Sequence, residues 1–343
     1  MDLVKKVKQY INTRHLLSKN DTVIVGVSGG PDSVALISIL HALQYELKIK
    51  LIAAHFNHCL RPEAQGDERF VEDLCRDLNL DFIRGEWKKE KLPQKGSLEE
   101  LARQVRFKFF VKTARAKKAN VVALGHHRDD LAETILMRIL RGTGLQGMQA
   151  ILPKREINGF NFIRPLLGVT KEEIKDYLRK HNLKFRMDAT NKNIDFSRNK
   201  IRLKLLPLLE KEYKTNIREV LANLSENAAA DYEYLKTQAL KSFKRLRETS
   251  GSNTIQFNLD SFKREHLALK RLLIRLSIEH LKGDTNQLTM RHWKEIENLL
   301  DDRPFGSIVH LPGDIYVQKR KYHLIIGLRI VIRSATEKIK KAP

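Results

Sequence analysis

Cysteine is scarce in this chain of 343 residues, which contains only Cys59 and Cys75. These two residues supply neither a disulfide framework nor a Cys-X-X-Cys redox or zinc motif. Long apolar runs are also missing, since none approaches the roughly 20 residues that a membrane-spanning helix needs. The first residues lack the apolar core of a signal peptide. We therefore expect a cytoplasmic protein with reduced thiols and no membrane association.

Acidic residues are also few compared with basic residues. The chain has 64 Lys and Arg against 41 Asp and Glu, a net charge of +23, and both halves share the excess. A chain of this charge attracts polyanions, which indicates a nucleic-acid partner. The alternative is a generally basic protein whose charge serves only solubility. The length exceeds what one ordinary core accommodates and predicts two or three domains.

The most informative segment joins a predicted strand at residues 22–27 to a predicted helix at 34–40. It has the sequence Ser28-Gly29-Gly30-Pro31-Asp32-Ser33. Glycines let the backbone approach an oxyanion, and a helix N-terminus offers unpaired N–H groups and the positive end of its dipole. The segment therefore predicts a phosphate-binding loop, with an ordinary capped strand–helix turn as the alternative.

This phosphate loop (residues 28–33) contains no lysine. It therefore differs from a Walker loop, which needs a Lys-Ser/Thr pair, and it does not fit G-x-G-x-x-G either. Asp32 stands among the phosphate donors, where a bare carboxylate would repel phosphates. We expect Asp32 to hold Mg²⁺, which would remove that conflict.

The rest of the first half predicts a doubly wound α/β domain with five parallel strands. Further strands are expected at 51–56, 81–84, 120–124 and 160–164, with helices between them. Ligands of such sheets bind at the carboxyl ends of the strands. This rule places His55 and residues 125–134, Gly-His-His-Arg-Asp-Asp-Leu-Ala-Glu-Thr, at the same rim as the phosphate loop.

Two pairs of charged residues in this half are candidates for chemistry. Asp130 and Glu133 lie three residues apart at the start of a predicted helix, so their carboxylates share one face and can bind an amine, hold Mg²⁺ or accept a proton. Helix capping explains one such acidic residue but not the pair. Arg103 and Arg106 have the same spacing on another helix, where the alternative is ordinary solvent exposure.

Seven motifs, in order over residues 20–205, resemble the tRNA(Ile)-lysidine synthetases, a branch of the PP-loop ATP pyrophosphatases. They lie at 28–33, 54–61, 98–107, 125–134, 141–148, 188–191 and 198–202. One position departs from the family pattern, because Met148 replaces the usual leucine. The resemblance implies an adenine nucleotide α-hydrolase-like fold and an enzyme that uses ATP and Mg²⁺.

The implied reaction adenylates the C2 oxygen of cytidine 34 in the CAU anticodon of tRNA(Ile) and releases pyrophosphate. The ε-amine of free L-lysine then attacks C2 and displaces AMP. Activation is needed because the C2 carbonyl is a poor electrophile, and lysine must first lose a proton.

The resemblance also implies roles for individual residues. The ATP-binding set is Ser28, Gly29, Gly30, Pro31, Asp32, Ser33, His55 and His126. The lysine- and tRNA-binding set is Glu133, Arg103, Arg106, Arg198 and Arg202. Asp130 is the candidate general base or Mg²⁺ ligand, Asp32 holds Mg²⁺, and Glu133 holds the lysine ammonium. Arg106 is expected to steady a phosphate or the adenylated intermediate.

The second half contains no chemical motif. We expect a catalytic domain at 1–212 and a mostly helical tRNA-binding domain at 213–343, with helices at 215–246, 263–281 and 290–300. A β-hairpin at 307–317, a strand at 322–328 and a basic tail complete it. Longer family members carry a further C-terminal module, which this chain looks too short to hold in full. A homodimer is compatible with the sequence.

Three alternatives remain open. A PP-loop tRNA thiolase would need a cysteine pair, which Cys59 and Cys75 do not form in sequence. An amidating synthetase of the same superfamily would need an ammonia source, and no segment resembles an amidotransferase. A nucleotide-regulated RNA-binding module without catalysis is the third alternative, and an assay for turnover separates it from the synthetase.

Overall fold

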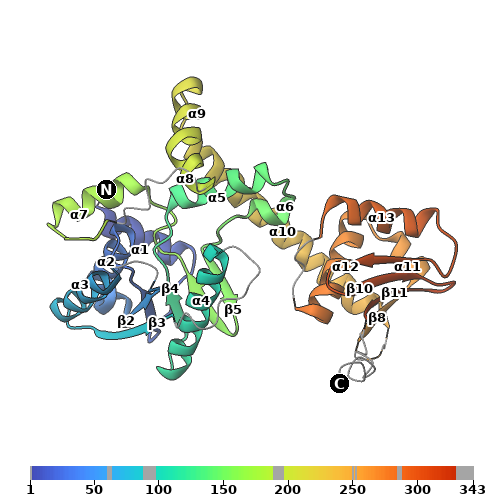
Figure 1. The fold of residues 1–343 in the computed structure, drawn as a ribbon, viewed down its shortest axis with the longest axis horizontal. Coiled ribbons are helices and arrows are strands. Elements are labelled where there is room, and N and C mark those ends of the chain that lie inside the picture. The colour runs from blue at the N-terminus through green and yellow to red at the C-terminus, as the bar shows by residue number, and fades with distance from the viewer. Residues whose placement is uncertain are drawn as a thin grey trace, which may run out of the picture. The chain divides into compact units, whose positions relative to one another are not determined.

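The computed structural model describes residues 2–59, 64–87, 98–187, 197–248, 251, 253–283 and 288–329. The chain forms two compact units, Met1–Ala229 and Ala230–Pro343, called here the N-terminal and C-terminal units (Figure 1). The domain boundary that we placed at 212 stays a prediction. Across the described part of the chain, no helix combines the length and apolar character that a membrane span requires.

The N-terminal unit alternates strands and helices. Its strands are β1 (Thr22–Gly26), β2 (Lys50–Asn57), β3 (Asp81–Glu86), β4 (Val121–Ala123), β5 (Lys154–Ile157) and β6 (Phe160–Ile163). Its helices are α1 (Leu3–Thr13), α2 (Pro31–Leu47), α3 (Ala64–Asp77), α4 (Leu98–Ala116), α5 (Arg128–Leu140), α6 (Leu145–Met148), α7 (Lys171–Lys180), α8 (Ser197–Lys200) and α9 (Leu206–Tyr213). A π-helical turn, Ile201–Leu205, joins α8 to α9, and α10 (Ile217–Leu246) contains the division between the units.

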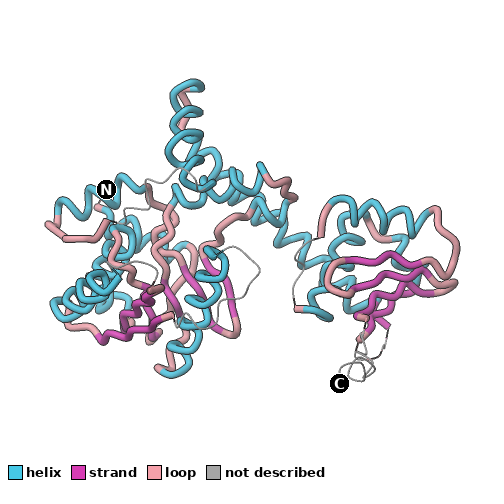
Figure 2. The backbone as a smooth tube through the Cα atoms, viewed as in Figure 1, coloured by secondary structure: helices cyan, strands magenta, loops and turns pink. Residues whose placement is uncertain are grey.

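The sheet of this unit, whose strands are magenta in Figure 2, has the order β3-β2-β1-β4-β6-β5. The first five strands in this order are parallel, which confirms the doubly wound prediction. All five predicted parallel strands are present, and β5, which we did not predict, adds a sixth, antiparallel strand at the edge beside β6. The turn between them is Asn158-Gly159, with φ of 52° and 82°, a pattern typical of tight hairpins.

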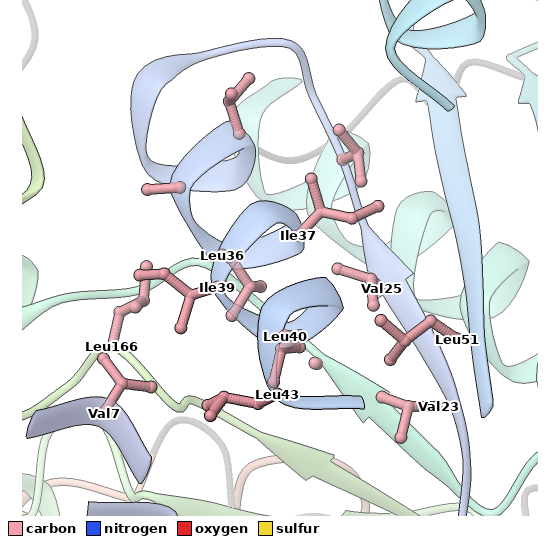
Figure 3. Packing of buried hydrophobic residues seen from close by; sticks show 14 of the residues in the cluster. Val7, Val23, Val25, Leu36, Ile37, Ile39, Leu40, Leu43, Leu51 and Leu166 are labelled. Atoms are coloured by element: carbon pink, nitrogen blue, oxygen red, sulfur yellow. The ribbon is translucent and has the colours of Figure 1, made fainter. Parts of the chain in front are cut away.

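Helices cover both faces of this sheet, because successive strand residues point to opposite sides. Val23 and Val25 of β1 share one buried cluster with α1, α2, α3 and α7, and much of that packing is visible in Figure 3. Ile24 points the other way, into a cluster with Phe110 of α4. The order of the strands reverses between β1 and β4, and crevices at such switch points are where open α/β sheets bind ligands.

The C-terminal unit contains an antiparallel sheet of order β7-β8-β11-β10-β9. Its strands are β7 (Arg247–Glu248), β8 (Thr254–Asn258), β9 (Ile308–Leu311), β10 (Ile315–Lys319) and β11 (His323–Leu328), and its helices are α11 (Leu259–Arg264), α12 (Leu267–Lys282) and α13 (Met290–Asp301). A buried cluster that includes Phe257, Phe262 and Trp293 joins the sheet to these helices. The predicted helices and small β element are confirmed, although the sequence did not reveal β7 and β8.

Candidate active site

The phosphate loop follows β1 and opens α2, as predicted. Ser33 Oγ accepts a hydrogen bond from Ser28 N at 3.1 Å and donates to the Gly30 carbonyl at 2.9 Å. Gly29 has φ of 84°, a conformation that strains other residues, and Pro31 fits the first helical turn. The N-cap residue of α2 is Gly30, which has no side chain to cap the helix. Its first N–H groups therefore point to an anion site, as expected for a phosphate loop.

Gly125, two residues after the end of β4, allows residues 125–134 and the phosphate loop to come together. A Cβ atom at this position would lie 3.1 Å from the backbone oxygen of Asp32 and 3.3 Å from the backbone nitrogen of Ser33. Both neighbours are backbone atoms of the first turn of α2, so they cannot give way as a flexible side chain would. The glycine thus permits residues 125–134 to pack directly on the phosphate loop.

His127 gathers three carboxylates at this junction. Its Nε2 lies 3.6 Å from Asp32 Oδ2 and 3.5 Å from Asp130 Oδ2, and its Nδ1 lies 3.5 Å from Asp129 Oδ2. The side chain is 1% exposed. Burial by itself would lower the pKa of His127, but the three carboxylates raise it to about 10. A buried imidazolium therefore holds Asp32 and Asp130 close to one another.

Asp130 and Glu133 project from the first turns of α5, as their spacing predicts. Asp130 Oδ2 accepts a hydrogen bond from the backbone N–H of His127 at 3.0 Å, so it also caps the helix. Glu133 is 1% exposed and accepts hydrogen bonds from Arg202 Nε at 2.6 Å and Arg198 Nε at 2.7 Å. Arg198 also donates to Asp130 Oδ1 at 2.8 Å. The two carboxylates and two guanidinium groups form one charged network.

A second apolar cluster explains why these arginines reach the carboxylates. Ile201 and Leu206 are buried together with Leu131 and Ile135 of α5. This packing fixes the helical segment that contains Arg198 and Arg202 against the helix that contains Asp130 and Glu133. Burial alone would raise the pKa of Asp130, but His127 and Arg198 lower it, so the carboxylate is ionised.

His126 differs in charge from His127, the next residue in the chain. Burial lowers the pKa of His126 to about 3, with Asp130 opposing the shift and Arg164 and Arg106 adding to it, so the ring is neutral. Its Nδ1 atom is buried and has no hydrogen-bond partner among the described residues. Arg106 Nε is likewise buried and has no hydrogen-bond partner among these residues. Buried donors and acceptors without partners are costly, which marks this region as a place for a polar ligand.

The residues present fit a magnesium ion. Asp32 Oδ1 is buried at the phosphate loop without a hydrogen-bond partner in the described structure. Within the described ranges, no group of three or more His, Cys, Asp or Glu side chains forms a metal site. Mg²⁺ usually takes only one or two carboxylates and completes its octahedron with phosphate oxygens and water. A lone Asp32 beside a phosphate loop matches that donor set.

Two residues support the phosphate loop from outside. His55 Nδ1 lies 2.8 Å from the carbonyl oxygen of Val27, the residue before the loop. Arg186 N donates to the carbonyl of Gly29 at 2.9 Å, and the Arg186 guanidinium pairs with Asp67 at 3.1 Å. We predicted that His55 contacts ATP, and this role stays a prediction. No pattern in the sequence pointed to Arg186, because its contacts depend on the chain returning to the loop after α7.

The predicted site residues thus fall into two groups. The phosphate loop, Asp130, Glu133, Arg198, Arg202 and His126 come together at the switch point between β1 and β4. Arg103 lies on the exposed side of α4, over the ring of Phe107 at 5.5 Å. The motif segment 188–191 lies outside the described residues. His127 was part of the motif we recognised, but its role as central cation was missed.

Comparisons with known proteins agree with this geometry. A family model described as a PP-loop domain matches residues 1–209. A tRNA(Ile)-lysidine synthase of Clostridioides difficile is 36% identical over 97% of this chain and 72% of its own length. The enzyme of the same name from Caldanaerobacter subterraneus is 37% identical over 94% of this chain and 69% of its own. The chain belongs to the tRNA(Ile)-lysidine synthase family.

Solved structures support the fold of this family member. The U34-tRNA thiolase NcsA of Methanococcus maripaludis superposes with a TM-score of 0.56, at 18% identity, over 65% of this chain and 78% of its own. At that identity the likeness concerns the fold alone. The predicted PP-loop architecture and membership of a ligase family are thereby established, whereas the roles of individual residues stay predictions.

Proposed function

We propose that this protein ligates free L-lysine to C2 of cytidine 34 in the CAU anticodon of tRNA(Ile), through a C2-O-adenylate, and releases AMP and pyrophosphate. One observation carries the proposal: Asp32 of the phosphate loop and Asp130 of the amine site lie within 3.6 Å and 3.5 Å of the same nitrogen, His127 Nε2. The site that activates an oxygen and the site that holds a nucleophile therefore share one rim.

The phosphate loop is proposed to bind the ATP phosphates, with Asp32 holding Mg²⁺. When bound, Mg²⁺ neutralises phosphate charge and stabilises the departing pyrophosphate. The chain's own contribution is the uncapped N-terminus of α2 and the hydroxyls of Ser28 and Ser33, which are 3.2 Å apart and turned to the same side of the loop. Together they orient the phosphates for attack by the C2 oxygen at the α-phosphorus.

Lysine is a zwitterion with an additional ammonium, and the charged network on α5 complements it. Asp130 and Glu133 are proposed to bind an ammonium group, while Arg198 or Arg202 binds the α-carboxylate. Each guanidinium now pairs with Glu133 at 2.6–2.7 Å, so lysine exchanges some of these contacts for its own. A site that offers both guanidinium and carboxylate groups selects ligands that carry both a negative and a positive charge.

The proton that lysine must lose poses a separate question. Since His127 and Arg198 lower the pKa of Asp130, its carboxylate is a weak proton acceptor. We therefore favour an electrostatic role for Asp130, holding the amine or a metal ion, over that of general base. Neutral His126 beside Arg106 is proposed to line the place of the adenylated base. A cytoplasmic location and a homodimer also stay predictions.

Incubating the protein with ATP, Mg²⁺, radiolabelled lysine and an unmodified tRNA(Ile) transcript tests the proposal. We expect label in the tRNA and release of pyrophosphate, both dependent on cytidine 34. A transcript with uridine at this position is the matched control. Binding of tRNA without turnover would support the nucleotide-regulated RNA-binding module instead. Label transfer that is independent of nucleotide 34 would contradict the proposed substrate.

A further inference from the structure

Five arginines without carboxylate partners gather beside the site, on the α4 side of the sheet. They are Arg103 and Arg106 of α4, Arg138 of α5, Arg155 of β5, and Arg164 directly after β6. We call them the arginine cluster. In the described parts of the chain, none of the five forms an ion pair with an acidic side chain, whereas Arg198, Arg202 and Arg218 all do.

The fold places these residues together by regular geometry. Arg155 is the register partner of Phe162, whose side chain belongs to the α4 face, and Arg164 follows two residues later on the same face. Phe107 of α4 stacks on Phe162 at 5.0 Å, and Arg103 lies over Phe107 at 5.5 Å. The stacked rings of Phe107 and Phe162 thus place Arg103 of α4 on the same face of the sheet as Arg155 and Arg164.

Backbone carbonyl groups orient Arg138 and Arg164 of the arginine cluster but do not neutralise their positive charges. Arg164 Nη1 donates to the carbonyl of Leu152 at 2.7 Å, and Arg138 Nη1 donates to that of Gly147 at 2.6 Å. The Nε atoms of Arg106 and Arg164 are buried and lack hydrogen-bond partners among the described residues. Oriented guanidinium groups with unused donors form a built anion site.

Electrostatics point the same way. Burial lowers the pKa of Arg164 to about 10, and repulsion from Arg155 and Arg103 adds to the shift. Burial likewise lowers the pKa of Arg138, again with repulsion from Arg103 and Arg155. The charges therefore repel one another across a shared space, and an anion placed there would relieve the repulsion.

We propose that the arginine cluster binds backbone phosphates of single-stranded RNA next to the nucleotide that enters the site. This inference rests on the proposed function and assigns Arg138, Arg155 and Arg164 a role that the motifs did not suggest. The ATP phosphates have their own loop after β1, and β6 and β5 lie two and three strands away, roughly 10–15 Å. A second phosphate-bearing ligand is thus expected at the cluster, and the charges of Arg106 and Arg164 are near enough to His126 to lower its pKa.

Arg155→Gln tests the proposal, since Arg155 is exposed and its loss leaves the core intact. Lys154→Gln is the matched control, because it removes one positive charge from the neighbouring residue on the opposite face of β5. Affinity for a labelled anticodon stem-loop RNA is measured without ATP and lysine, at several salt concentrations. We expect Arg155→Gln to weaken binding roughly 5- to 10-fold and to reduce the salt slope by about 0.7. The control should change neither.

Arg138→Gln supplies a second measurement from another element, with folding checked by circular dichroism. It should weaken RNA binding in the same way and leave the affinity for ATP–Mg²⁺, measured by calorimetry, unchanged. Loss of ATP affinity with unchanged RNA affinity in both variants would assign the cluster to nucleotide phosphates and overturn the proposal. Equal effects of Arg155→Gln and Lys154→Gln would also overturn it.

These outcomes are distinguishable from failure of the proposed function. If RNA binding depends on the arginine cluster but the protein transfers no lysine, the cluster is an RNA site and the proposed ligase function is wrong. If the protein transfers lysine but its RNA affinity does not change on substitution of Arg138 or Arg155, the ligase function stands and the proposed role of the cluster is wrong.

Discussion

Replacing Glu133 by glutamine is expected to destabilise the N-terminal unit substantially, although the two side chains have nearly the same shape. Glu133 is 1% exposed and accepts three hydrogen bonds from two arginines. Glutamine keeps one oxygen acceptor, and its amide group would place N–H donors against a guanidinium. Among the residues that the structure describes, Arg202 would then keep only its 3.7 Å contact with Asp130 Oδ1 as an ion pair.

The size of the effect follows from burial. Removing one partner of a fully buried ion pair costs about 3–5 kcal/mol. The side chains of Arg198 and Arg202 are 31% and 21% exposed, so solvent screens part of the loss. We therefore expect about 3 kcal/mol, which corresponds to a decrease of roughly 6–12 °C in Tm for a unit of this size.

Thermal unfolding followed by circular dichroism measures this effect. Glu212→Gln is the control, because Glu212 is exposed on α9 of the same unit and should change Tm by less than about 2 °C. If Glu133→Gln were no more harmful than Glu212→Gln, the network of Glu133 with Arg198 and Arg202 would not exist as described. The same variant should also raise the KM for lysine, which separates a binding role from stability alone.

Three further predictions concern the loop, the metal and the thiols. Gly125→Ala should weaken ATP binding several-fold and lower the free energy of unfolding by about 1–3 kcal/mol, because its Cβ would lie 3.1 Å from the backbone oxygen of Asp32. An unchanged affinity for ATP in calorimetry would contradict this close packing. Asp32→Asn should reduce Mg²⁺-dependent pyrophosphate release by about 100-fold or more, and an unaltered Mg²⁺ titration would exclude Asp32 as ligand. Burial raises the pKa of the Cys75 thiol to about 12, so near pH 8 Ellman's reagent should react quickly with Cys59 alone, and rapid loss of two thiols from the folded chain would refute this.

Local patterns were sufficient for most of the fold. The parallel strands β1, β2 and β4 are mostly apolar and buried, so their apolar runs and the order of the motifs located them. The edge strand β5 was missed because Lys154, Arg155 and Glu156 are exposed and show no apolar alternation. β8 was missed for a different reason, since its partner β11 lies far along the chain, and β7 is a strand of only 2 residues that pairs with β8.

The site was predictable as a set of residues but not as a network. Asp130 and Glu133 share a helix face, which spacing reveals, whereas Arg198 and Arg202 are about 65–70 residues away and reach them only through the packing around Ile201. The sequence also cannot tell two adjacent histidines apart. Burial beside arginines lowers the pKa of His126 to about 3, while three carboxylates raise that of His127 to about 10.

The proposed function is the attachment of lysine to cytidine 34 of tRNA(Ile). Mass spectrometry of the nucleoside at position 34, in tRNA(Ile) from cells depleted of the protein, is its decisive test. We expect unmodified cytidine to accumulate there, and the lysine adduct to return when the chain is restored but not when its Asp32→Asn variant is supplied. Persistence of the lysine adduct at position 34 after complete depletion would contradict the account.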